Sequence, residues 1–208
     1  MVKNSKKVKI KQSPRWLALQ ILAAIVLIMW AVFALQSFFG FEFDKLGILP
    51  RSKQGLLGIF FSPFIHSNIE HIGYNTLALV FVSLVLALSF PKRFILIFLV
   101  LLTTTGVLVW IFARSAYHIG MSGVIFALIG YTVAYGIVRR SFLSIVLAIL
   151  VGLTYGGLLY GILPLKLNVS WESHLLGVIS GVFLGIILGS IDYKKAKLLK
   201  TEIESTTE

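Results

Sequence analysis

Six long apolar runs are the feature of this sequence that most constrains its fold. A helix of about 20 apolar residues is long enough to cross the hydrocarbon core of a bilayer. Apolar residues make up 58% of the 208 residues and charged residues only 13%, against roughly 45–50% and 25% in soluble domains. The sequence therefore predicts an all-α membrane protein with six transmembrane helices and no separate soluble domain. The predicted spans cover 16–38, 71–90, 94–112, 120–138, 142–163 and 173–191.

The distribution of basic residues predicts the orientation of these spans in the membrane. Fourteen Lys and Arg residues lie in the two tails and in the breaks at 91–93 and 139–140, whereas five lie in the alternate breaks. Because Lys and Arg accumulate in cytoplasmic loops, we expect a multi-pass protein of a bacterial plasma membrane with both termini in the cytoplasm. The expected organisation is a basic N-terminal tail (1–15), a six-span membrane domain (16–191) and a C-terminal tail (192–208).

Composition also limits the chemistry available to the chain. The absence of cysteine excludes disulfides, thiolate nucleophiles and Cys-based metal sites. The formal net charge of +11 comes from residues at the chain ends and in the breaks, so we interpret it as a topology signal and not as a nucleic-acid surface. We expect the bilayer as a partner, and no cofactor or metal.

Polar residues concentrate where the second, fourth and sixth spans begin. If both termini are cytoplasmic, the starts of these three spans all lie at the same depth, near the outer leaflet. Polar side chains are costly inside a bilayer, so such a cluster is a functional hypothesis. The residues are His66, His71, Asn75, His118, Ser122 and His174.

Ser122 lies in the tetrapeptide Gly120-Met121-Ser122-Gly123, at the start of the fourth span. The first N–H groups of a helix have no intrahelical acceptor, and the helix dipole is positive there. A serine at this position could attack a carbonyl while its own N–H donates to the developing oxyanion. Serine at a helix start is commonly only a cap, so the tetrapeptide alone leaves both interpretations open.

Small residues form a stripe on both the fourth and the sixth span. Such stripes allow membrane helices to approach closely, and packing the two together would bring His174 to Ser122. Helix packing with His174 bonded to backbone would also explain the glycines, but not the position of this histidine. The stripes are Gly123, Ala127, Gly130 and Ala134 on one span, and Gly177, Gly181, Gly185 and Gly189 on the other.

His71 and Asn75 are one helical turn apart and therefore share a face of the second span. Their donors could stabilise an oxyanion from the side opposite the N–H of Ser122. The alternative is that both side chains bond a neighbouring helix.

Taken together, three motifs in this order resemble those of the rhomboid intramembrane serine proteases. They are His66-x4-His71-x3-Asn75, the tetrapeptide around Ser122, and His174-x2-Gly177-x3-Gly181. The resemblance covers roughly 50–191, and six spans match the minimal core of that fold.

The resemblance implies a Ser–His dyad without a third carboxylate. Ser122 would be the nucleophile and His174 the general base, while His71, Asn75 and the N–H of Ser122 would form the oxyanion hole. The expected substrates are single-span membrane proteins, cut near the outer end of their transmembrane helix. By the same resemblance, the fifth span and the loop after it would gate lateral substrate access.

Two positions depart from the family pattern. Phe126 stands where the family often has a tyrosine that packs on the catalytic histidine, so the stacking role survives without the hydroxyl. A Trp-Arg pair that many members carry in the first loop has no match around Leu57-Gly58.

Other functions fit the sequence less well. His66-x3-Glu70-His71 superficially resembles a zinc-peptidase motif, but its histidines are at i and i+5 and not at i and i+4. A channel or carrier would place polar residues along a pathway, and no charged residue lies in the middle of a span. A catalytically silent protein that binds client transmembrane helices would lack Ser122 or His174.

Two further histidines have structural roles in this interpretation. His118 could compete with His174 as the base, but in the break before the fourth span we expect it to be more solvated and less fixed. His66 is expected to tie down the first loop, whose apolar segment 55–65 is too short to span a bilayer and would lie in the outer interface.

Overall fold

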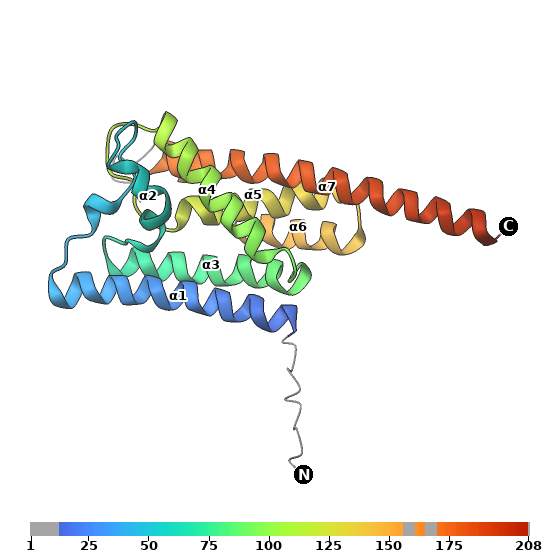
Figure 1. Ribbon diagram of the computed structural model, residues 1–208, viewed down its shortest axis with the longest axis horizontal. Helices are drawn as coiled ribbons and strands as arrows, with labels where there is room; N and C mark the ends of the chain where they lie inside the picture. Colours follow the sequence, from blue (N-terminus) through green and yellow to red (C-terminus); the bar gives the residue numbers. More distant parts are fainter. Residues whose placement is uncertain (1–12, 156–160, 165–169, 208) are drawn as a thin grey trace, which may run out of the picture.

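The structure is a computed structural model that describes residues 13–155, 161–164 and 170–207 (Figure 1). Within these ranges the regular secondary structure is helical, and the isolated β-bridge between Ile48 and His118 is the one pairing of extended segments. The predicted all-α membrane fold is therefore confirmed.

Five helices are long and apolar enough to cross a bilayer, and each coincides with a predicted span. The fifth predicted span, 142–163, begins as α6 (Phe142–Tyr155), and its part at 156–160 lies outside the described residues. The last helix continues as one element well past the predicted end of its span at residue 191. The five helices are α1 (Pro14–Phe39), α3 (Ile69–Ser89), α4 (Phe94–Phe112), α5 (Ser122–Arg139) and α7 (Trp171–Thr207).

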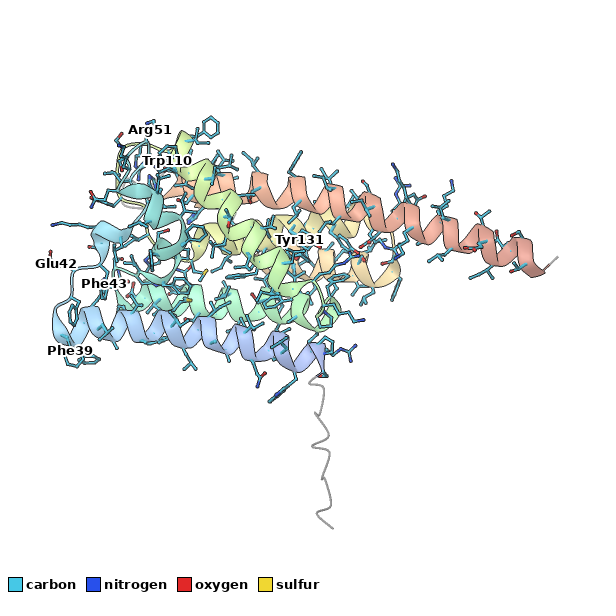
Figure 2. All side chains as sticks on the ribbon, in the orientation of Figure 1. Phe39, Glu42, Phe43, Arg51, Trp110 and Tyr131 are labelled. Carbon is cyan, nitrogen blue, oxygen red and sulfur yellow. The ribbon has the colours of Figure 1, made fainter. Side chains whose placement is uncertain are left out.

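Helix α5 lies at the centre of the bundle, and α3, α4, α6 and α7 pack around it (Figure 1). Most of its side chains are buried, and Tyr131 in its middle is almost completely enclosed (Figure 2). A membrane helix surrounded by other helices needs small residues, because lipid tails give no hydrophobic drive for association and close packing must supply it.

The contact between α5 and α7 is the closest in the bundle. A Cβ atom placed on Gly177 would overlap the carbonyl oxygen of Gly123, and one placed on Gly181 would overlap that of Ala127. Only hydrogen atoms fit between the two backbones at these positions. The packing of the two small-residue stripes predicted from the sequence is thus confirmed.

An ion-pair cluster joins three segments at the end of the bundle that holds both termini of the described chain. Arg93, in the turn between α3 and α4, donates to both carboxylate oxygens of Asp192 on α7, at 2.6 and 3.1 Å. The hydroxyl of Tyr135 on α5 donates to the same carboxylate at 2.9 Å. Bidentate pairs of this kind fix geometry as well as adding energy, so the cluster holds α7 against its neighbours.

The opposite end of the bundle carries α2 (Gly55–Phe61) and a 3-10 turn at Ser62–Phe64 (Figure 1). Arg51 anchors this region by donating to the carbonyl of Ala113 at 2.7 Å, and the indole N–H of Trp110 donates to the carbonyl of Ser52 at 2.9 Å (Figure 2). An arginine and a tryptophan therefore tie the first loop to the end of α4, although they come from separate segments and not from one dipeptide.

Candidate active site

Ser122 and His174 meet at the end of the bundle that carries α2. Ser122 is the first residue of α5, and His174 lies in the first turn of α7. The Oγ atom of Ser122 lies 2.8 Å from Nε2 of His174, which is hydrogen-bond distance. The glycine packing of α5 against α7 sets this distance, because the two backbones touch just below the pair.

Two further contacts hold the His174 ring. Its Nδ1 atom lies 2.9 Å from the carbonyl oxygen of Gly161. Phe126 stacks on the ring with centroids 4.3 Å apart and planes 11° apart. A carbonyl oxygen only accepts, so Nδ1 carries the hydrogen and Nε2 presents its lone pair to the hydroxyl of Ser122. The sequence anticipated the stacking of Phe126, whereas no side-chain pattern could have indicated a backbone carbonyl.

The turn before Ser122 contains a glycine, and two of its backbone N–H groups donate to acceptors in the first loop. Gly120 has φ +101°, a conformation that favours glycine, and a Cβ atom there would lie 2.8 Å from the His71 ring. The N–H of Gly120 donates to the carbonyl of Ser62 at 2.8 Å, and that of Met121 donates to Nε2 of His66 at 3.5 Å. The turn is thereby fixed from the side of the first loop.

His71 and Asn75 both lie against this turn from α3. A Cβ atom on Gly120 would be 2.8 Å from Nε2 of His71 and 3.8 Å from Nδ2 of Asn75. Nδ2 of Asn75 also donates to the carbonyl of His71 at 3.0 Å, which leaves its second hydrogen for another acceptor. The structure therefore brings both side chains to Gly120, in the turn before the serine.

His66 has a contact that the sequence did not reveal. Besides holding the first loop through Phe64, whose carbonyl lies 3.4 Å from Nδ1, the ring accepts from the backbone of Met121. Burial, together with the neighbouring His71, lowers the pKa of His66 to about 4. The ring is thus neutral at physiological pH and keeps an acceptor nitrogen.

His118 is buried, and the expectation that it would be solvated is wrong. Its backbone pairs with Ile48 in the isolated bridge, and the residue is only 2% exposed. Nδ1 lies 3.1 Å from the hydroxyl of Ser170, and Nε2 lies 3.1 Å from the carbonyl of Arg114. Burial lowers the pKa of His118. Both ring nitrogens have partners other than Ser122, so the structure does not bring this histidine to the serine.

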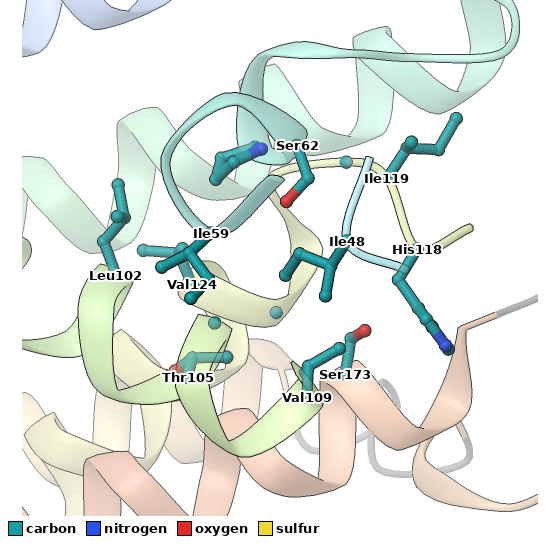
Figure 3. A pocket seen from close by; sticks show the side chains of 14 residues that line it. Ile48, Ile59, Ser62, Leu102, Thr105, Val109, His118, Ile119, Val124 and Ser173 are labelled. Atoms are coloured by element: carbon teal, nitrogen blue, oxygen red, sulfur yellow. The ribbon is translucent and has the colours of Figure 1, made fainter. Parts of the chain in front are cut away.

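A small cavity of about 20 Å³ lies between α2, α4, α5 and α7 (Figure 3). Gly120 and Gly123, on either side of the serine, line it together with Ser62, Thr105 and Ser173. This volume corresponds to about one water molecule. In the described part of the chain, no three His, Asp or Glu side chains are close enough together to hold a metal ion.

The sequence matches known proteins along most of its length. The profile of the Rhomboid domain matches residues 53–191. An uncharacterised protein of Mycobacterium tuberculosis is 29% identical over 90% of this chain and 82% of its own length, and one of Mycobacterium bovis matches equally. An uncharacterised protein of Mycobacterium leprae is 32% identical over 78% of this chain and 68% of its own length.

Proposed function

The chain belongs to the rhomboid family, since the Rhomboid domain covers residues 53–191, and from this premise we propose that it is an intramembrane serine endopeptidase. The observation that carries the proposal is the 2.8 Å contact between Ser122 Oγ and His174 Nε2 at the start of α5. A nucleophile within hydrogen-bond reach of a base that is itself oriented by a third group is the signature of an activated serine.

In the proposed reaction, Ser122 Oγ attacks the scissile carbonyl while its proton passes to Nε2 of His174. The tetrapeptide turn directs the N–H of Ser122 toward the oxyanion, and His71 and Asn75 add donors from α3. His174 then returns the proton to the departing amine, which leaves an acyl group on Ser122. A water that gives its proton to His174 hydrolyses this ester and regenerates the serine.

The substrates of the proposed reaction are transmembrane proteins cut near the outer end of their helix. The site lies at one end of the bundle, opposite the end that holds both termini of the described chain (Figure 1). With the basic residues placed in the cytoplasm, this end faces outward and has access to water. We expect the substrate helix to arrive beside α6, which makes its main contact with α5.

Active-site labelling tests the proposal directly. A fluorophosphonate should modify the purified protein at Ser122, because the reagent reacts with serines that a neighbouring base activates. Peptide mapping identifies the labelled residue. A protein that binds client helices without cutting them would leave Ser122 unmodified, and that result would favour the silent alternative.

The proposed topology predicts the behaviour of reporter fusions. A reporter that is active only in the cytoplasm should be active when fused to residue 1 and when fused to residue 208. The reason is the unequal division of Lys and Arg between the two sides. An inactive reporter at either end would overturn the orientation and place the dyad on the inner side.

The proposed oxyanion hole predicts a loss of turnover in Asn75→Ala. One donor of such a hole contributes roughly 2.7–4 kcal/mol in soluble proteases, and His71 offers a second donor that softens the loss. We therefore expect a decrease of about 10-fold or more in kcat on a transmembrane reporter.

Thr76→Ala is the matched control for this variant. Thr76 is the next residue of α3, but its hydroxyl accepts from the indole of Trp30 on α1 at 3.0 Å, away from the serine. Its kcat should be unchanged. If the double variant His71→Ala, Asn75→Ala cleaved at the wild-type rate, neither residue would belong to the mechanism.

A further inference from the structure

We propose that the backbone carbonyl of Gly161 is the positioning group of this active site, and that it takes the place of the carboxylate found in soluble serine proteases. The inference rests on the proposed function, because it assigns what fixes the base of the same reaction. It gives Gly161, which lies between α6 and α7 in the chain, a role in positioning the base.

The two nitrogens of His174 have different partners. Nε2 lies 2.8 Å from Ser122 Oγ, and Nδ1 lies 2.9 Å from the carbonyl oxygen of Gly161. A neutral imidazole has one N–H. If that hydrogen were on Nε2, the lone pair of Nδ1 would face the lone pairs of the carbonyl and Nε2 could not accept from the serine. The carbonyl therefore selects the tautomer that a general base requires.

The contacts of the His174 ring with the described residues are with Gly161, Ser122 and Phe126, and none of these is a carboxylate. The nearest acid in the sequence, Glu172, is buried and forms an ion pair with Arg114 at 3.5 Å. The contact recorded for Nδ1 of His174 in the described residues is with Gly161. His174 is 9% exposed, and hydrogen bonds strengthen where water is largely excluded. The same Nδ1–H bond persists when the ring becomes an imidazolium during catalysis, and it is then charge-assisted.

The absence of a side chain at residue 161 lets the carbonyl approach. A Cβ atom there would lie 3.1 Å from Nδ1 of His174 and 3.3 Å from the ring of Phe126. Both contacts are tight, so a methyl group would displace the histidine, the stacked phenylalanine or the carbonyl. Glycine thus fits at position 161, between Nδ1 of His174 and the Phe126 ring that stacks on this histidine.

The test compares Gly161→Ala with Gly152→Ala. Gly152 is on α6, and a Cβ atom there would meet nothing within 4 Å. We expect Gly161→Ala to slow the fluorophosphonate labelling of Ser122 by about 3- to 10-fold, because the neighbours must move by a few tenths of an ångström and a misplacement of roughly 1 Å costs about 100-fold. Gly152→Ala should be labelled at the wild-type rate. The labelling reagent is small, so the comparison does not depend on access of a substrate helix.

The tautomer of His174 is a second measurement. A purely structural role of Gly161 would leave this tautomer unchanged. The chain has four histidines, so nitrogen NMR of histidine-labelled protein can assign each ring with single variants. We expect Nδ1 of His174 to be protonated in the neutral wild-type ring and in Gly152→Ala. In Gly161→Ala the Nε2-protonated form should appear. A second variant adds no atom: an ester in place of the amide between residues 161 and 162 weakens the carbonyl as an acceptor, and it should shift the tautomer the same way.

The outcomes separate the two proposals. If wild-type Ser122 is not labelled at all, the protease proposal fails, and the tautomer of His174 still decides whether Gly161 positions the ring. If wild type is labelled and Gly161→Ala retains both the labelling rate and the Nδ1-protonated tautomer, the positioning role of Gly161 is wrong while the dyad stands.

Discussion

Replacing Ser122 or His174 by alanine is expected to abolish cleavage of a membrane-spanning reporter, with a loss on the order of 10⁴-fold or more. The 2.8 Å contact between them makes nucleophile and base a unit. Members of such a unit have effects that do not add. The double variant should therefore be no worse than either single variant, measured as kcat in reconstituted vesicles.

Ser83→Ala is the matched control for the nucleophile. Ser83 is a buried serine whose hydroxyl has no hydrogen-bond partner among the described residues, so its removal should leave kcat unchanged. His118→Ala should retain measurable activity. If His118→Ala were inactive while His174→Ala cleaved normally, the base would be misassigned. Cleavage by Ser122→Ala would refute the protease proposal as a whole and favour a client-binding membrane protein.

Among replacements of the α7 glycines by valine, Gly181→Val is expected to cause the largest loss of stability. Even one added carbon would overlap the carbonyl oxygen of Ala127, so α5 and α7 must separate. Overpacking costs up to about 3 kcal/mol, and more where backbone has to move. That cost corresponds to a decrease of roughly 6–12 °C in the unfolding midpoint of a chain of this size, which can be measured in detergent micelles.

The same substitution at Gly73 is the control. Gly73 lies on α3, and a Cβ atom there would meet nothing within 4 Å, so Gly73→Val should keep the wild-type midpoint. Gly181→Val should also lose labelling at Ser122, because separating the helices withdraws His174 from the serine. An unchanged midpoint in Gly181→Val would mean that the helices are farther apart than described here.

The helices and their contact faces could be predicted from the sequence because each follows from a local rule. Span positions follow from apolar length, and the α5–α7 contact follows from small residues every three or four positions. Predicting the contact of Ser122 with His174 required one further inference. Packing the two small-residue stripes together also places the first turns of α5 and α7 side by side. The family motifs indicated the same pair.

Contacts made through the backbone could not be predicted. The acceptor for His174 is a carbonyl that every residue possesses, so Gly161 carried no signal in the sequence. The contact of His66 with Met121 joins two loops whose path depends on the whole bundle. His118 was misjudged for a related reason. A histidine in a polar break is ordinarily solvated, but here the backbone of the break pairs with Ile48. The ring contacts the hydroxyl of Ser170 and the carbonyl of Arg114, and the residue is buried.

The Arg93–Asp192 ion pair has a consequence for the angular register of α7. Asp192 follows His174 by 18 positions, which is five full turns at about 3.6 residues per turn. The carboxylate and the imidazole therefore point in the same direction from two positions five turns apart on one unbroken helix. Arg93 and Tyr135 both donate to this carboxylate, and these contacts oppose rotation of α7 about its own axis. The direction in which His174 points from the helix axis is thus fixed at the end of the bundle opposite the proposed active site.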